Sequence, residues 1–235
     1  MRVVGLAFVS VVAALSVACS VTSNGDGSSG GSSGSSTTPT GDASTSGDSP
    51  TGGDGGPATT PPPSSKEADV VFDGTCSAFA ACGGSPQGTY DYTAGCLTDA
   101  FAAAKAQCPT LDTTGADVKV KGSLHFLGPA LSRDAVVTIS GTIVVPSACS
   151  AGQCATVETA LKGAFDTVSC TGIAACTCTI YNTEIVKSSS TFTVAGNTVT
   201  TGDGESYEIC ATAASLKYSG KSLGSEDGHW ELTKR

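Results

Sequence analysis

The chain has 235 residues and a formal net charge of −9, with 14% charged residues, 6% aromatic residues and 11 cysteines. An acidic chain without a basic stripe excludes a typical nucleic-acid binder, because phosphate contacts need clustered Lys and Arg. The cysteine content speaks against a reducing compartment, where thiols are few or are committed to metals and catalysis.

The first residues are typical of an export signal. Arg2 supplies one positive side chain, and residues 3–18 are uncharged and mostly apolar. This run is short for a membrane-spanning helix, which needs about 20 residues, whereas it suits the apolar region of a signal peptide. We therefore predict a signal peptide over residues 1–18 and export of the mature chain.

The stretch Leu15-Ser16-Val17-Ala18-Cys19 resembles a bacterial lipobox. The resemblance implies that Cys19 is acylated and anchors the chain in a lipid membrane, since acyl chains contribute about 0.8 kcal/mol per buried methylene. Ser20 after the cysteine is similar to lipoproteins of the outer membrane, which implies the outer rather than the inner membrane. An ordinary signal peptidase would also accept Ser16-Val17-Ala18, so cleavage without lipidation is the alternative.

Residues 19–66 consist almost entirely of Ser, Gly, Thr, Pro and Asp. Such a segment has too few apolar side chains to offset the entropy of ordering the chain, so we predict a disordered tether. A Gly/Ser chain of this length spans roughly 35–40 Å. We expect it to lift one folded domain, residues 67–235, away from a membrane.

Two stretches of that domain have helical spacing of apolar residues. The first stretch repeats them at Leu97, Phe101, Ala104 and Cys108. Thr98 can cap this segment and Pro109 ends it. The second stretch repeats them at Val157, Leu161 and Phe165. One or two short helices are therefore expected.

Other segments alternate apolar and polar residues with the period of two that half-buried strands show. In residues 117–127 the apolar face carries Val118, Val120, Leu124 and Phe126. The polar face carries Asp117, Lys119, Lys121, Ser123 and His125. The next segment repeats the pattern at Val137, Ile139, Ile143 and Val145, after a turn that begins at Gly128-Pro129.

The remaining strand signals lie toward the C-terminus. Residues 191–194 and 198–200 flank Ala195-Gly196-Asn197, which predicts a hairpin. Residues 207–212 alternate, and the last segment places Trp230 and Leu232 on one face. We expect seven or eight antiparallel strands in the whole domain. His125 and His229 fall on polar faces, so we expect both to be surface residues.

Ten cysteines follow Cys19, and their even number in an exported domain predicts up to five disulfides. They are Cys76, Cys82, Cys96, Cys108, Cys149, Cys154, Cys170, Cys176, Cys178 and Cys210. Cys149 and Cys154 span a tight loop and form a candidate local bridge. Cys176 and Cys178 would point the same way on a strand, so each should pair elsewhere. Each bridge typically contributes about 2–5 kcal/mol to a domain short of aromatic residues.

Two short stretches resemble the ends of a known fold. The segment Cys82-Gly83-Gly84-Ser85-Pro86-Gln87-Gly88-Thr89-Tyr90 is similar to the opening of small lipocalin-like domains, in which Gly-x-Trp begins the first barrel strand. The ending His229-Trp230-Glu231-Leu232-Thr233-Lys234-Arg235 looks like their closing strand. The predicted fold is mainly β: an antiparallel, lipocalin-like β-barrel or strongly curved sheet with one or two short helices, held by disulfides. The family binds small apolar ligands inside the barrel.

The chemical motifs are weak, and we predict no enzyme, no metal and no cofactor. Gly220-Lys221-Ser222-Leu223-Gly224 matches Gly-x-Ser-x-Gly, but it lacks the strand–turn–helix context that a nucleophile elbow needs. Asp203, Glu205 and Glu208 could hold calcium, although a polar hairpin turn is the preferred interpretation. Zinc would require paired Cys-x-x-Cys knuckles, which the sequence lacks.

The sequence leaves two functional hypotheses. In the first, a membrane-anchored lipoprotein passively binds a small apolar molecule, with Tyr90, Tyr92, Phe126 and Phe192 as wall residues. In the second, the barrel is filled by its own side chains, which small barrels allow, and the protein is a structural or interaction module of the cell envelope. An open cavity would favour the first hypothesis, and a filled core with an exposed apolar patch would favour the second.

Overall fold

The structure is a computed structural model that describes residues 61–72, 76–98, 100–220 and 228–235. The predicted signal peptide, Cys19 and most of the predicted tether lie outside the described residues. The strands are β1 (Ala68–Val71), β2 (Gly88–Leu97), β3 (Asp112–Leu127), β4 (Ala130–Val145), β5 (Thr167–Thr171), β6 (Cys176–Ala195), β7 (Thr198–Thr201), β8 (Ser206–Ala211), β9 (Ser215–Gly220) and β10 (Gly228–Lys234). The helices within the same ranges are α2 (Ala102–Gln107), α3 (Ser147–Ser150) and α4 (Cys154–Leu161).

All ten strands belong to one sheet that closes into a ring. Strand β4 pairs with β3 on one side and with β6 on the other, and β7, β8, β9, β10 and β2 complete the circuit back to β3. The pairings around this circuit are antiparallel. The prediction of a mainly antiparallel, strongly curved sheet is therefore confirmed.

The two remaining strands are short additions to the ring. Strand β1 lies between β2 and β3 beyond their direct pairing, parallel to β2 and antiparallel to β3. Strand β5 pairs with β6 near the N-terminal end of that strand. Neither strand was located from the sequence, because segments of 4 and 5 residues carry too little alternation to stand out.

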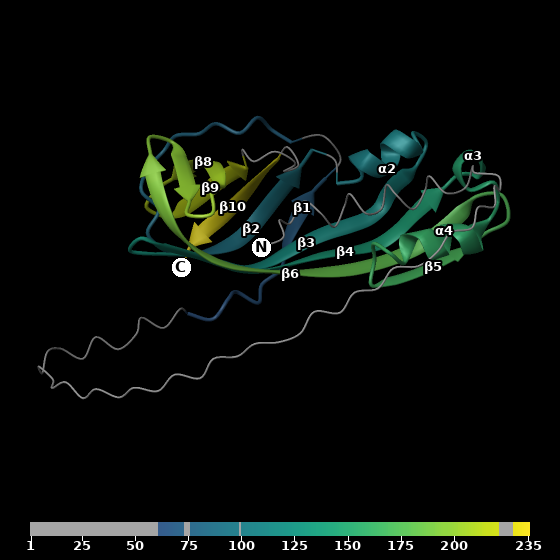
Figure 1. The fold of residues 1–235 in the computed structure, drawn as a ribbon, viewed down its shortest axis with the longest axis horizontal. Helices are drawn as coiled ribbons and strands as arrows, with labels where there is room; N and C mark the ends of the chain where they lie inside the picture. The colour runs from purple at the N-terminus through teal and green to yellow at the C-terminus, as the bar shows by residue number, and fades with distance from the viewer. Residues whose placement is uncertain (1–60, 73–75, 99, 221–227) are drawn as a thin grey trace, which may run out of the picture. The chain divides into compact units, whose positions relative to one another are not determined.

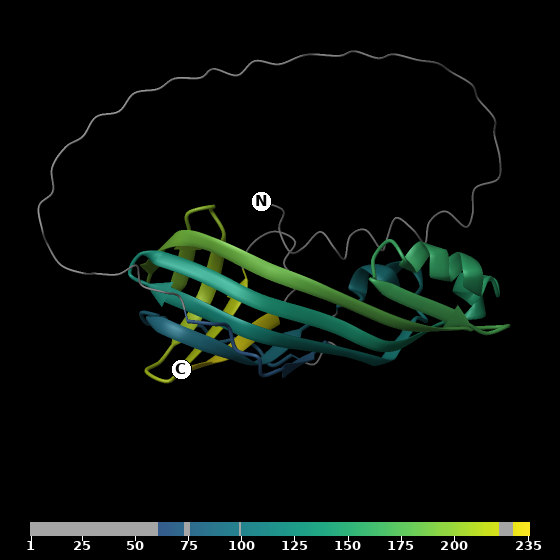
Figure 2. The same cartoon turned by 90° about the horizontal axis from the view of Figure 1, so that it is seen from below.

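Three long strands connect the ring to the helices. Strands β3 and β4 have 16 residues each and β6 has 20, whereas strands usually have about 5–6. Figure 2 shows them running side by side from the β7–β10 hairpins at one end to α3 and α4 at the other. Each long strand therefore contributes one half to the ring and the other half to a sheet that the helices cover (Figure 1).

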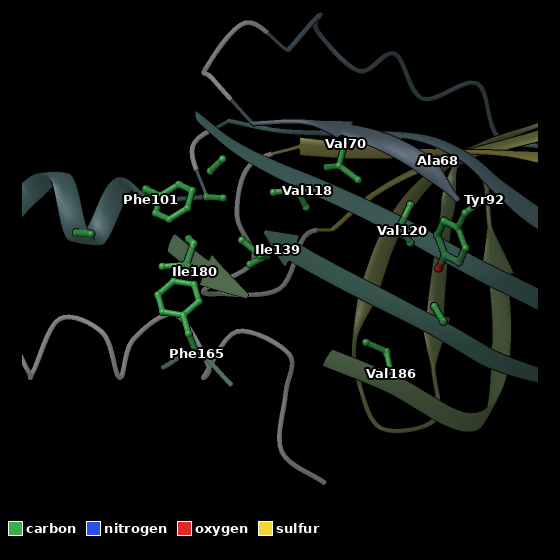
Figure 3. Packing of buried hydrophobic residues seen from close by; sticks show 14 of the residues in the cluster. Ala68, Val70, Tyr92, Phe101, Val118, Val120, Ile139, Phe165, Ile180 and Val186 are labelled. Atoms are coloured by element: carbon green, nitrogen blue, oxygen red, sulfur yellow. The ribbon is translucent and has the colours of Figure 1, made fainter. Parts of the chain in front are cut away.

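The apolar positions of the predicted strands form a continuous core. Val118, Val120, Leu124 and Phe126 of β3 are all buried, which confirms the predicted apolar face of this strand. Figure 3 shows Val118, Val120 and Ile139 on the inner face of the long strands. It also shows Phe101 and Phe165, which come from segments that are not part of the sheet.

The first helix is shorter than predicted. Leu97 has helical spacing to Phe101, but it is the last residue of β2 and pairs with Gly228 of β10, and α2 begins only at Ala102. The hydrogen-bonding partner on β10 overrides the local pattern, because it satisfies backbone groups that a helix start would leave unpaired. The helix predicted around Val157 and Leu161 is confirmed as α4.

The prediction that both histidines are surface residues is wrong. His125 is 1% exposed and His229 is 6% exposed. Segments outside the strands cover the polar face: the backbone N–H of Ser64 donates to Ser123 Oγ at 2.9 Å on β3, and the Phe79 ring lies 6.0 Å from that of His229. Alternation identifies the face of a strand correctly, but it does not show whether another segment crosses that face.

Five disulfides use all ten cysteines of the domain. The pairs are Cys76–Cys96, Cys82–Cys210, Cys108–Cys149, Cys154–Cys176 and Cys170–Cys178. The proposed Cys149–Cys154 bridge is therefore wrong, because α3 presents Cys149 to the end of α2 while α4 presents Cys154 to β6. Cys176 and Cys178 pair elsewhere, as predicted. Five disulfides indicate an oxidising, exported environment.

Candidate functional site

An apolar cavity lies between α2, α4 and the sheet. Its wall is formed by Ala100, Phe101, Ala103, Ala104, Cys108, Leu111, Ile143, Val145, Val157, Leu161 and Phe165. The last residues of β4 form its floor, and the two helices form its sides. Apart from Ala103, which is exposed on α2, these residues are buried. The cavity therefore reaches the surface beside Ala103.

Disulfides hold both helices in place around this cavity. Cys108, directly after α2, is bonded to Cys149 of α3, and Cys154 at the start of α4 is bonded to Cys176 of β6. Glu158 of α4 also accepts the backbone N–H of Cys170 in β5 at 2.9 Å, which lowers the pKa of this carboxyl. Helices of 6 and 8 residues are marginal alone, so these links supply the rigidity of the wall.

The cavity is small. Its volume of about 30 Å³ corresponds to about two water-sized groups. An apolar lining offers such water no hydrogen-bonding partners, so a short alkyl end fits its chemistry better than a water molecule does. Only the end of a larger ligand fits inside it.

The four predicted wall residues lie in the other half of the molecule, inside the ring. Tyr90, Tyr92 and Phe126 are buried and Phe192 is partly buried. The Phe126 ring packs edge-on against Tyr90 at 6.0 Å and against Phe192 at 5.1 Å, and Tyr92 packs against Trp230 at 5.8 Å. The structure thus brings three of them into one cluster, where their rings contact one another.

The ring also contains a cation that sequence reasoning missed. Arg133 of β4 places its guanidinium carbon 5.7 Å from the ring centre of Tyr207 and 5.6 Å from that of Tyr218. The hydroxyls of Tyr92 and Tyr218 are 2.9 Å apart, and the Tyr207 hydroxyl donates to Glu205. Burial raises the pKa of Tyr207 to about 12 despite the nearby cation. The alternation of β4 could have located this residue, because Arg133 shares the inward-facing positions of the strand with Leu131 and Ala135.

A polar cluster occupies the outer face of β2 and β3. Arg235 donates to Asp91 at 2.8 Å and to the carbonyl of Pro62 at 2.9 Å, and Ser123 donates to Asp91 at 2.6 Å. Burial alone would raise the pKa of Asp91, but these hydrogen bonds outweigh it and the pKa is lowered. His125 Nδ1 lies 3.0 Å from Thr89 Oγ1, and burial lowers the pKa of this imidazole. The cluster fastens the entering chain to the sheet.

The weaker motifs gain little support. Ser222 and Asp227 of the Gly-x-Ser-x-Gly hypothesis lie outside the described residues. Asp203 and Glu205 belong to the turn between β7 and β8. No group of three or more metal-binding side chains occurs in the described ranges. Within those ranges no helix is long and apolar enough to cross a membrane.

Comparison of the chain with protein-family models, with curated proteins and with solved structures finds no match.

Proposed function

We propose that the protein is an exported lipoprotein, anchored to the bacterial envelope through Cys19, whose lipocalin-like domain binds a small apolar molecule. The outer membrane is the proposed location. Support for export comes from the five disulfides, and support for the anchor comes from the lipobox-like residues before Cys19.

The observation that carries the binding proposal is the wholly apolar wall of the cavity between α2 and α4. The proposed ligand inserts a short alkyl end between Phe101, Leu161 and Ile143. Binding is passive, because the wall offers no nucleophile, acid or base. The proposed binding site is therefore beside the helices, whereas the sequence pointed to the aromatic residues of the ring.

Isothermal titration with an uncharged probe that carries one alkyl chain, 1-hexanol, tests this proposal on the full chain with its disulfides formed. We expect saturable binding, and we expect Ala103→Phe to weaken it at least about tenfold because a phenyl ring at this exposed rim position blocks the entrance. Ala106→Phe is the matched control, since Ala106 is also exposed on α2 but does not line the cavity. Equal binding by both variants would overturn the assignment of the site.

The second candidate function is a structural or interaction module with a filled ring. The packing of Arg133 against Tyr207 and Tyr218 favours it, because these side chains occupy the interior of the ring. Absence of saturable probe binding by the unmodified protein is the outcome that selects this alternative.

The anchor has its own test. Intact-mass analysis of protein extracted from its cells should give a mature chain that begins at Cys19 and carries acyl chains. A Cys19→Ala variant should leave the membrane fraction. A soluble unmodified protein that begins after residue 18 would instead support cleavage without lipidation.

A further inference from the structure

The segments that form α3 and the turn between β5 and β6 have no charged side chains. Residues 146–157 and 167–183 contain no Asp, Glu, Lys or Arg, although the chain as a whole has a net charge of −9. Within them, residues 147–153 and 171–175 form what is called here the uncharged tip. Figure 1 shows α3 at the end of the molecule opposite to β8 and β9.

Ile173, in the turn between β5 and β6, is the most exposed large apolar side chain of the described residues. It is 94% exposed, and Gly172 and Ala174 beside it are exposed as well. Ala148 and Ala151 are exposed on the other segment of the tip. A single exposed apolar residue is ordinary in a soluble protein. Here it lies on a surface without charges, so the tip can leave water without desolvating an ion.

The two segments of the tip are held together. A Cβ added at Gly152 would lie 2.8 Å from the carbonyl oxygen of Ile173, so the two backbones are in contact. The Cys154–Cys176 disulfide joins the start of α4 to the start of β6 next to them. The tip is therefore preorganised, and it loses little further chain entropy when it contacts a partner.

We propose that the uncharged tip contacts the lipid surface in which Cys19 is anchored, and that Ile173 inserts its side chain among the lipid headgroups. The proposal rests on the proposed membrane anchor. An apolar side chain gains free energy by leaving water at this interface, whereas anionic headgroups repel the acidic surface of the rest of the protein. The tip is the part of this acidic chain that approaches a lipid surface without such repulsion.

The length of the predicted tether allows this contact. The described chain starts at Pro61, and the backbone N–H of Ser64 donates to Ser123 of β3. From Ser123 to Asp112, at the end of β3 beside the helices, the strand spans roughly 35 Å. A Gly/Ser chain of the length between Cys19 and Pro61 also spans roughly 35 Å. The anchor and the tip can therefore engage the same membrane.

The opposite end of the molecule is less suited to this contact. Leu127 and Val194, its exposed large apolar side chains, are each only 37% exposed. The turn between β7 and β8 at the same end carries Asp203 and Glu205, which oppose contact with anionic headgroups. Exposure and the absence of charge coincide at Ile173 instead.

Partition between water and phosphatidylcholine vesicles tests the proposal on the chain from Cys19 onward, with its five disulfides formed. The Cys19 thiol is coupled to one chain of myristoyl length, because a single chain of that length binds membranes only weakly and reversibly. A second contact then changes the measured partition, and the result does not depend on natural acylation. Failure of this proposal is therefore distinguishable from failure of the anchor, which intact-mass analysis measures.

We expect Ile173→Asp to lower the partition coefficient at least about threefold, because the burial of an apolar side chain is lost and a charge enters the tip. Ile185→Asp is the matched control, since Ile185 is 65% exposed on the same strand as Lys187 and lies outside the tip. It should keep the unmodified partition. Equal partition of both variants and the unmodified chain would overturn the proposal. An equal loss in both variants would also overturn it, because the contact would then lie on the outer face of β6.

Fluorescence locates the inserted side chain directly. Trp230 is the only tryptophan of the chain, so Ile173→Trp adds one emitter at the tip. We expect brominated acyl chains to quench this added emission in the vesicle-bound protein, and to leave the added emission of Ile185→Trp unquenched. Unquenched emission from Ile173→Trp contradicts the insertion. Unchanged partition of Ile173→Asp with reduced self-association in size-exclusion chromatography would instead assign the tip to a second copy of the chain.

Discussion

Single residues at crowded points of the sheet control whether the long strands can pair. Gly122 lies in the middle of β3 with a φ of +127°, and a Cβ there would meet the carbonyl oxygen of Asp134 and lie 2.5 Å from Ala135 Cα. Gly128, in the β3–β4 turn, also has positive φ, at +60°, but a Cβ there would meet nothing within 4 Å. A side chain at Gly128 would therefore cause backbone strain alone, whereas a side chain at Gly122 would cause both strain and steric collision.

We predict that Gly122→Ala destabilises the domain by more than about 3 kcal/mol, because strain and collision with backbone atoms act together. Gly128→Ala should cost only about 1–2 kcal/mol, the ordinary penalty of a side chain in the left-handed region. Urea unfolding followed by circular dichroism measures both. Similar losses for the two variants would show that the strands adjust around Gly122.

His125 should make stability depend on pH. Burial lowers the pKa of His125 below its ordinary value of 6.5, with Asp91 and Asp134 opposing and Arg235 adding to the shift. The unfolded chain therefore binds more protons between the folded pKa and about 6.5, so this stabilising contribution is complete above about 6.5 and is lost as the pH falls below it.

The expected result is a decrease in the urea midpoint from pH 7 to pH 5 that is smaller in His125→Gln. Ser132→Ala, which changes the residue opposite His125 in β4, should retain the wild-type slope. Equal slopes in all three proteins would assign the pH dependence to other groups.

At the scale of elements, disulfides fasten the connecting segments to the sheet. Cys82–Cys210 joins residues 128 positions apart and holds the segment before β2 against β8, where Ala211 N also donates to Gly83 O at 2.7 Å. Cys76–Cys96 closes a separation of only 20 residues. Chain entropy makes the longer link the more stabilising one.

Replacing both cysteines of Cys82–Cys210 by Ala should lower the free energy of unfolding by about 5 kcal/mol, and the same change at Cys76–Cys96 by about 3 kcal/mol. Denaturant titration of the two double variants gives the comparison. The reverse order would mean that local contacts, rather than loop closure, determine the contribution of each bridge.

The sequence predicted elements better than it predicted their partners. Alternation located β3, β4 and the β6–β7 hairpin because one face of each strand packs on the core. It failed at Leu97, where a partner 131 residues away in β10 determined the conformation, and at the cysteines, whose pairing depends on how helices are placed. The cavity beside α2 could likewise not be predicted from the sequence, because its wall combines α2, α4 and β4 with the connections beside them. Arg133 was overlooked although it occupies an inward position.

At the scale of the whole molecule, ring closure depends on β10. This strand pairs with β2 on one side and with β9 on the other, and it carries the only tryptophan of the chain, Trp230. Its removal would expose an edge on each neighbour and uncover the core around Leu232.

We expect a chain that lacks residues 228–235 to lose the near-ultraviolet circular dichroism of packed tyrosines and to associate in size-exclusion chromatography. Deletion of Arg235 alone should leave the ring closed, because Arg235 lies outside β10. A monomeric, packed protein without β10 would show that β2 and β9 can pair directly.

The position of β1 has a mechanical consequence. The chain approaches the sheet at Pro62, whose carbonyl accepts a hydrogen bond from Arg235, and enters it as β1, which lies beside β2 and β3. Tension applied along the preceding residues loads the β1 hydrogen bonds in shear. Behind them β2 and β3 still pair directly between residues 88–91 and 123–126, so β1 can be pulled free while the ring stays closed. We expect force spectroscopy on the folded chain to show a small first extension from β1, followed at higher force by rupture of the ring.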